Sequence, residues 1–101
     1  MSKKNEKRDE FRKNKISGHP AYIYQKVGNK YLYIGITHAN ITDKTKNIKL
    51  DKNPNPLDKK TAYIRPKSEQ QKENKFSKKP FKNWKFTEKD KDKVNKVIKK
   101  R

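Results

Sequence analysis

Apolar and polar residues alternate on both sides of a short turn signal in residues 21–36 (AYIYQKVGNKYLYIGI), and this pattern predicts a β-hairpin. We place the turn at Gly28-Asn29, because both residue types tolerate the positive φ that tight hairpin turns require. Val27 is then expected opposite Lys30, and this pairing sets the register of the whole hairpin.

This register gives the hairpin two different faces, because successive side chains of a strand point to opposite sides. One face is aliphatic and can be buried; it carries Ala21, Ile23, Val27, Leu32, Ile34 and Ile36. The other face carries tyrosines and a lysine, namely Tyr22, Tyr24, Tyr31, Tyr33 and Lys26. On that face Tyr24 is expected directly opposite Tyr33.

Shorter patterns predict the remaining elements. Residues 47–50 (NIKL) and 61–65 (TAYIR) alternate as short strands, and the Asn-Pro-Asn-Pro stretch between them predicts a rigid turn. A helix is expected over Glu88 to Lys99, because Thr87 can cap its start and acidic residues occupy its first turn.

Together these elements predict a mainly β (β+α) fold. We expect a small twisted SH3-like barrel or half-barrel of four to five short strands, with one C-terminal helix. Residues 1–16 are interpreted as a disordered basic arm and residues 17–66 as the barrel domain. Residues 67–79 are interpreted as a flexible linker, and residues 80–101 as an aromatic cluster followed by the helix, with Trp84 either anchoring the helix or stacking on a ligand.

The charge of the chain points to a polyanionic partner. Thirty Lys and Arg residues face eleven Asp and Glu residues, a net charge of +19, while only 28% of the residues are hydrophobic. Such an excess destabilises the compact free state and favours nucleic acid as a partner. Arginine is scarce, so lysines acting as point charges on phosphate are expected. Single-stranded nucleic acid or structured RNA is favoured over sequence-specific duplex DNA.

The predicted tyrosine face suggests how such a ligand is held. Unpaired bases can stack on tyrosine rings while nearby basic groups contact phosphate. The predicted nucleic-acid-binding residues are Tyr22, Tyr24, Lys26, Lys30, Tyr31, Tyr33, Lys59, Lys60 and Arg65. The alternative is that the tyrosines belong to the core, with only their hydroxyl groups at the rim.

Composition also excludes several classes of site. The chain has no cysteine, which excludes disulfides and thiolate ligands, and two histidines are too few for a typical zinc site. We therefore expect no metal and no cofactor. No apolar run reaches membrane-spanning length and the N-terminus lacks a secretory pattern, so a cytoplasmic protein without membrane contact is expected.

The segments HPAYIYQ and KYLYIGITHA, within residues 19–40, resemble the opening of the PemK and MazF-like toxin barrels. The resemblance implies a small barrel that cleaves single-stranded RNA with an arginine and a Thr or Ser at the position of Thr37. No arginine lies between Lys13 and Ile64, so Arg12 or His19 would have to replace the family's basic residue.

The two histidines offer a separate route to catalysis. Extrapolating the hairpin register sets His19 opposite His38, where two imidazoles could act as general acid and base on RNA. The alternative is two loop histidines that only flank strand ends.

The leading prediction is a non-enzymatic nucleic-acid-binding protein. The first alternative is a metal-independent endoribonuclease of the toxin type that uses Thr37, His38 and His19, and the second is an adaptor for an acidic protein. Nothing in the sequence indicates an oligomeric state.

Overall fold

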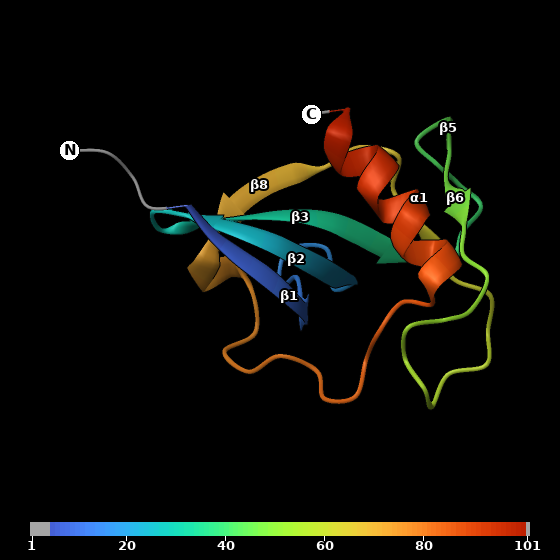
Figure 1. The fold of residues 1–101 in the computed structure, drawn as a ribbon, viewed down its shortest axis with the longest axis horizontal. Helices are drawn as coiled ribbons and strands as arrows, with labels where there is room; N and C mark the ends of the chain where they lie inside the picture. Colours follow the sequence, from blue (N-terminus) through green and yellow to red (C-terminus); the bar gives the residue numbers. More distant parts are fainter. Residues whose placement is uncertain (1–4, 101) are drawn as a thin grey trace.

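An open antiparallel sheet organises the computed structural model, which describes residues 5–100 (Figure 1). The three long strands β1, β2 and β3 lie side by side, and two short strands, β7 and β6, extend the sheet beyond β3. A further strand, β8, pairs with the first half of β3. The bounds are Asn5–Lys13 for β1, Pro20–Val27 for β2, Lys30–Thr37 for β3, Ile48–Lys49 for β6, Tyr63–Ile64 for β7 and Glu69–Lys72 for β8.

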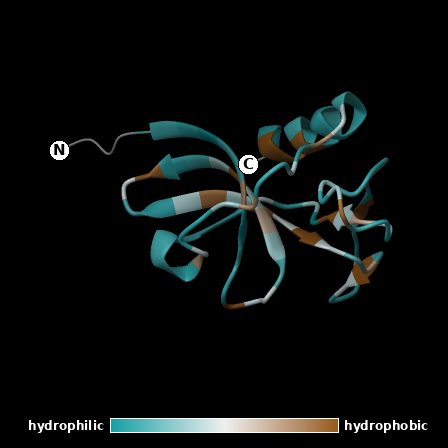
Figure 2. Ribbon diagram, turned by 90° about the horizontal axis from the view of Figure 1, so that it is seen from below, coloured by the Kyte–Doolittle hydropathy of each residue, from teal (hydrophilic) through white to brown (hydrophobic). Residues whose placement is uncertain are grey.

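The remaining elements lie around this sheet. A two-stranded hairpin is formed by β4 (Ile41–Thr42) and β5 (Thr45–Lys46), and a short 3₁₀ helix, η1 (Glu73–Lys75), follows β8. The helix α1 (Glu88–Lys99) forms a layer of its own beside one face of the sheet (Figure 2). No helix in the described part of the chain is long and apolar enough to cross a membrane.

The prediction of a mainly β fold with one C-terminal helix is confirmed. The prediction allowed a barrel or a half-barrel. The sheet is not a closed barrel, because its strand order runs from β1 at one edge to β6 at the other. The helix has the predicted bounds, and the Thr87 side chain accepts a hydrogen bond from the backbone N–H of Asp90, as expected of an N-cap.

The expectation of a disordered basic arm is wrong for residues 5–13, which form the edge strand β1; residues 1–4 lie outside the described part. Phe11 explains the difference, because its side chain is only 3% exposed. Its ring lies 5.1 Å from the ring of Tyr22 and 5.0 Å from that of Phe86. One buried aromatic residue and pairing with β2 therefore hold a segment that its charge alone would leave unfolded.

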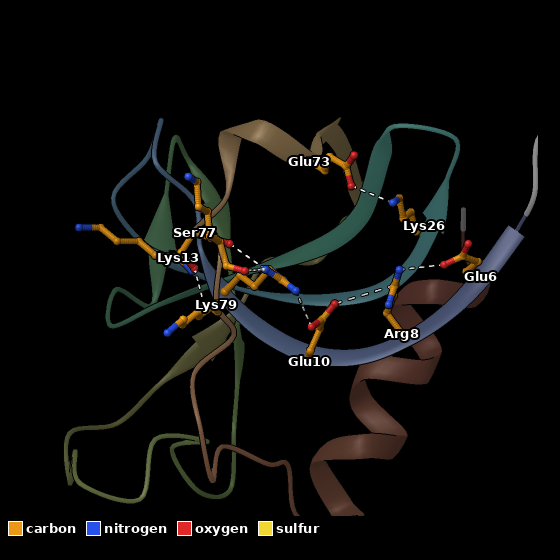
Figure 3. A network of polar contacts seen from close by, with 10 residues as sticks. Glu6, Arg8, Glu10, Lys13, Lys26, Glu73, Ser77 and Lys79 are labelled. Carbon is orange, nitrogen blue, oxygen red and sulfur yellow. Dashed lines mark hydrogen bonds and ion pairs between the residues drawn. The ribbon is translucent and has the colours of Figure 1, made fainter.

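The charges of β1 compensate one another along the strand (Figure 3). Arg8 lies between Glu6 and Glu10, with its Nη2 2.8 Å from a carboxylate oxygen of Glu6. Arg12 contacts Glu10 at 2.9 Å and also donates to the backbone carbonyls of Ser77 and Lys78 at 2.8 and 2.7 Å. The alternation of acid and base thus removes much of the repulsion expected of a basic arm.

The hairpin of β2 and β3 turns at Gly28-Asn29 as predicted, with φ of +62° at Gly28. The predicted register holds from Val27 opposite Lys30 to Gln25 opposite Leu32. A β-bulge between Ile23 and Gln25 then shifts the pairing by one residue, so that Ile23 faces Tyr33. The predicted pairing of Tyr24 with Tyr33 is therefore wrong.

This shift divides the four tyrosines between two cores on opposite faces of the sheet. Tyr22 and Tyr24 pack against the larger core, which α1 covers, whereas Tyr31 and Tyr33 belong to a smaller core around Phe76. The larger core contains Phe11, Ile34, Ile36, Leu50, Ala62, Ile64, Phe86, Val94 and Val97.

The expectation of a flexible linker over residues 67–79 is wrong as well. The segment contains β8 and η1, and it buries Phe76 to 1% exposure against the rings of Tyr31 and Tyr33. Trp84 stacks on Phe81 with ring centroids 4.5 Å apart and lies 5.7 Å from Phe11, which is the anchoring arrangement of the two that were predicted.

Candidate nucleic-acid interface

Three hollows adjoin one another: two lie where β2 begins and β3 ends, and the third lies along residues 49–62. We call them the Arg65 cavity, of about 550 Å³, the His38 hollow, of about 190 Å³, and the lysine hollow, of about 520 Å³. The first two share the lining residues His19, Pro20, Ile36 and Thr37, and the last two share Asn53, Asp58 and Ala62. Because neighbouring hollows share lining residues, the three are called the tract below.

The hairpin register places the first of these residues together. Ala21 pairs with Gly35, so the residues before β2 adjoin those at the end of β3. By continuation of this register His19 adjoins Thr37 rather than His38, which corrects the predicted placement. Both histidines nevertheless line the His38 hollow.

The Asn-Pro-Asn-Pro turn supplies the other side of the His38 hollow. Asn53 accepts a hydrogen bond from the backbone N–H of Asn55 at 2.9 Å, and Asn55 does the same for Leu57 at 3.0 Å. Such Asx turns fold the chain tightly without regular structure. The turn is also tied to the C-terminal segment, because the backbone N–H of Lys85 donates to the carbonyl of Pro54 at 3.3 Å.

Asp58, at the end of this turn, holds His38. Nε2 of His38 lies 2.8 Å from Oδ2 of Asp58, while the other carboxylate oxygen accepts the backbone N–H of Lys60 at 3.0 Å. The hydrogen bond from Lys60, and then that from His38, lower the pKa of Asp58. A carboxylate that stays ionised orients the imidazole, whose side chain is 55% exposed and accessible to a ligand.

The Arg65 cavity holds the guanidinium of Arg65 at its wall. Nη1 donates to Oδ1 of Asn47 at 2.7 Å and approaches the carbonyl of Thr42 at 3.5 Å. The aliphatic part of the Arg65 side chain packs against β3 at Gly35. A Cβ atom on residue 35 would lie 3.1 Å from Cγ of Arg65. The glycine therefore makes room for the arginine.

An acidic group lies on the wall of the same cavity. The hydroxyl of Tyr33 donates to Oε2 of Glu69 at 3.3 Å and accepts from Nδ2 of Asn14 at 3.4 Å. Burial, and then the charge of Glu69, raise the pKa of Tyr33, so the hydroxyl stays protonated at neutral pH. Asp43 lines the cavity as well, so the cavity offers one cation, Arg65, and two carboxylates to a ligand.

The lysine hollow is lined by Lys49, Lys52, Lys59 and Lys60, and also by two acidic residues, Asp51 and Asp58. All four lysine side chains are exposed, and within residues 5–100 none of them forms an ion pair. Lys59 and Lys60 were predicted as phosphate contacts, and the structure places both of them on the tract.

The predicted tyrosine platform is not formed. Tyr31 and Tyr33 are each 7% exposed, with their rings edge-on to Phe76, and the ring of Tyr22 lies 4.9 Å from that of Phe86. Lys26 is ion-paired with Glu73 at 2.9 Å. These side chains serve packing and local charge balance, because both faces of the sheet are covered. Tyr24 and Lys30 are half-buried on the same hairpin, away from the tract.

The tract does include Tyr33, whose hydroxyl lies at the Arg65 cavity although its ring is packed in the core. With it the structure brings together Thr37, His38, His19, Lys59, Lys60 and Arg65. Sequence reasoning missed Asp58 and Glu69. Asp58 belongs to the DKNPNPLDKK stretch, whose Asx and proline chemistry was a readable turn signal, but nothing local indicates that it meets His38.

Comparison with known proteins finds no matching family model, curated protein or solved structure. The resemblance to the PemK and MazF-like toxins stays a prediction. Within residues 5–100, no group of three His, Asp or Glu side chains comes together in a way that could hold a metal ion.

Proposed function

We propose that this protein binds single-stranded RNA along the tract. The observation that carries the proposal is the adjacency of three hollows, which are lined by lysines at one end, by two histidines in the middle and by an arginine at the other end. The net charge of +19 supplies the long-range attraction to a polyanion.

The form of the tract supports a single strand. Lysines act as point charges on phosphate and hold a flexible backbone without reading bases. Hollows of this size admit groups from an unpaired strand, whereas the bases of a duplex are stacked and paired. The helix α1 docks its apolar side on the core, and its start adjoins the lysine hollow, where Asp90 accepts the backbone N–H groups of Asp51 and Lys52.

The test is the salt dependence of RNA binding. A 12-nucleotide RNA, its DNA counterpart and a duplex are titrated with protein by fluorescence anisotropy at several salt concentrations. The logarithm of the binding constant falls linearly with the logarithm of the salt concentration, and for a single strand each phosphate contact contributes about 0.7 to the slope. The double variant Lys59→Gln/Lys60→Gln is therefore expected to bind more weakly and with a slope shallower by roughly 1.4.

The matched control is Lys96→Gln/Lys99→Gln, which removes the same charge from exposed positions in the last turn of α1, at the opposite end of the helix from Asp90. This variant should change binding much less. Equal losses in both double variants would mean that diffuse charge alone attracts the RNA, and the proposal would fail.

A second function is favoured by the His38–Asp58 hydrogen bond of 2.8 Å in a hollow that His19 and Thr37 also line. We propose it as metal-independent RNA cleavage. One imidazole accepts the proton of a ribose 2′-hydroxyl, whose oxygen bonds to phosphorus. The bond from phosphorus to the 5′-oxygen breaks, and the other imidazole, as imidazolium, protonates that oxygen. The products are a 2′,3′-cyclic phosphate and a 5′-hydroxyl.

Incubation of RNA with the protein in the presence of EDTA tests this second function. The wild type should release fragments with cyclic phosphate ends, and His38→Ala and His19→Ala should each lose the activity. If the wild type binds RNA but leaves it intact, the tract is a binding site only.

A further inference from the structure

The Arg65 cavity is larger than phosphate contacts alone require. Its volume of about 550 Å³ falls within the range of about 300–1,000 Å³ that is typical of small-molecule sites. Its polar groups converge from separate elements, with Asn14 after β1, Arg65 after β7 and Glu69 on β8. A cavity with this lining can hold a whole nucleotide unit rather than only the backbone of a strand.

Part of the lining is apolar and suited to the flat face of a base. Ala21 and Ile36 contribute the floor from β2 and β3. Ile41 of β4 lines the cavity too, although its side chain is 57% exposed, which makes it one of the few exposed large apolar residues of the described chain. An unpaired base that enters the cavity would cover this residue.

Glu69 distinguishes among the bases. Within residues 5–100, the only hydrogen bond that its carboxylate accepts comes from the hydroxyl of Tyr33, which uses Oε2 at 3.3 Å. An ionised carboxylate accepts hydrogen bonds through both oxygens and donates none. Guanine is the RNA base whose pairing edge presents two adjacent donors, the N1–H and the N2 amino group, and it matches a carboxylate in a bidentate pair.

Arg65 fits the phosphate of the same nucleotide. Both hydrogen bonds of its guanidinium to residues of the described chain are made by Nη1, so donors remain for a ligand. The carboxylates of Glu69 and Asp43 would repel a phosphate, so we assign the phosphate to the guanidinium of Arg65 and the base to Glu69.

We propose that the Arg65 cavity is a nucleobase site that takes a flipped-out guanine, with Glu69 accepting hydrogen bonds from its N1–H and N2 amino group. This inference rests on the proposed RNA binding and assigns a base preference to it.

The experiment compares RNA octamers of uridine that carry one central guanosine, adenosine, cytidine or uridine. Anisotropy titrations with the full-length wild-type protein should show tighter binding of the guanosine octamer by about 5- to 150-fold, the range of one bidentate contact. Equal binding of all four octamers would overturn the base site while leaving the proposed RNA binding intact. Failure to bind any octamer would overturn the proposed function itself.

Two variants locate the preference. Glu69→Gln replaces one acceptor with a donor and should abolish the guanosine preference while keeping or improving affinity for the uridine octamer. Glu88→Gln, an exposed residue in the first turn of α1, removes the same charge away from the cavity and should keep the preference. If Glu69→Gln still prefers the guanosine octamer, another residue reads the guanine and the inference is overturned. If this variant folds poorly, the comparison of the four octamers with the wild-type protein still tests the inference.

Discussion

Asp90 illustrates how one residue ties the helix to the tract. Its side chain is fully buried, and its carboxylate accepts the backbone N–H groups of Asp51 at 2.7 Å and Lys52 at 3.1 Å. Nζ of Lys93 forms an ion pair with Oδ1 of Asp90 at 3.4 Å. The start of α1 therefore fixes the beginning of the turn that carries the lysine hollow and Asp58.

Replacing this carboxylate should destabilise the fold. Asp90→Ala leaves two backbone donors without their partner, and we expect the free energy of unfolding to fall by about 1–3 kcal/mol. Urea titration followed by circular dichroism measures the change. Asp92→Ala, at an exposed position of the same helix, should stay within about 0.5 kcal/mol of the wild type. Equal losses in the two variants would contradict the role of Asp90.

The buried phenols predict an alkaline limit to stability. Burial, and then the hydrogen bond and charge of Asp9, raise the pKa of Tyr22, and burial and Glu69 raise that of Tyr33. Both groups remain protonated in the folded state while the unfolded chain releases their protons near pH 10. The unfolded state then binds fewer protons, so the free energy of unfolding should fall as the pH rises above 10.

Urea titrations at pH 8, 10 and 11 measure this loss. The double variant Tyr22→Phe/Tyr33→Phe should have a lower free energy of unfolding than the wild type at pH 8. Between pH 10 and 11, its free energy of unfolding should fall by less than that of the wild type. A parallel loss in both proteins would show that other groups set the alkaline limit.

At the level of elements, residue types within a few positions of one another correctly predicted the hairpin turn and the start of the helix. The Gly28-Asn29 turn and the Thr87 cap act within a few residues, and both occur as expected. The bulge near Tyr24 could not be predicted in this way, because tyrosine and isoleucine alternate on the hairpin and leave neither face clearly polar. Its position is set by cores on both sides of the sheet, which residues far along the chain complete.

Strand β1 was the element least visible in the sequence. Its charges suggested disorder, and a single phenylalanine outweighs them by inserting into a core that α1 and Phe86 build. Phe11→Ala is therefore expected to lower the free energy of unfolding by about 3–5 kcal/mol. Ile16→Ala, at a residue that is 63% exposed, serves as the control and should have little effect. Unchanged stability of Phe11→Ala in urea would restore the interpretation of a disordered arm.

At the scale of the whole molecule, folding gathers residues that the sequence keeps apart. Thr37, His38, Lys59 and Lys60 could be proposed one by one from residue type and position. Their meeting with Asp58 and Glu69 depends on contacts between distant segments, such as the 20-residue separation of His38 and Asp58. The sequence predicted a site on the tyrosine face of the β2–β3 hairpin. In the structure the candidate site lies instead at the open end of this hairpin.

The most direct test of this account is an amide chemical-shift titration of the labelled protein with a single-stranded RNA octamer. Shifts are expected to concentrate in residues 17–20, 35–43 and 51–65, which contain most of the residues that line the tract, while β1 and the exposed side of α1 change little. Shifts spread evenly over the lysines of α1, with no response from the residues around His38, would contradict it.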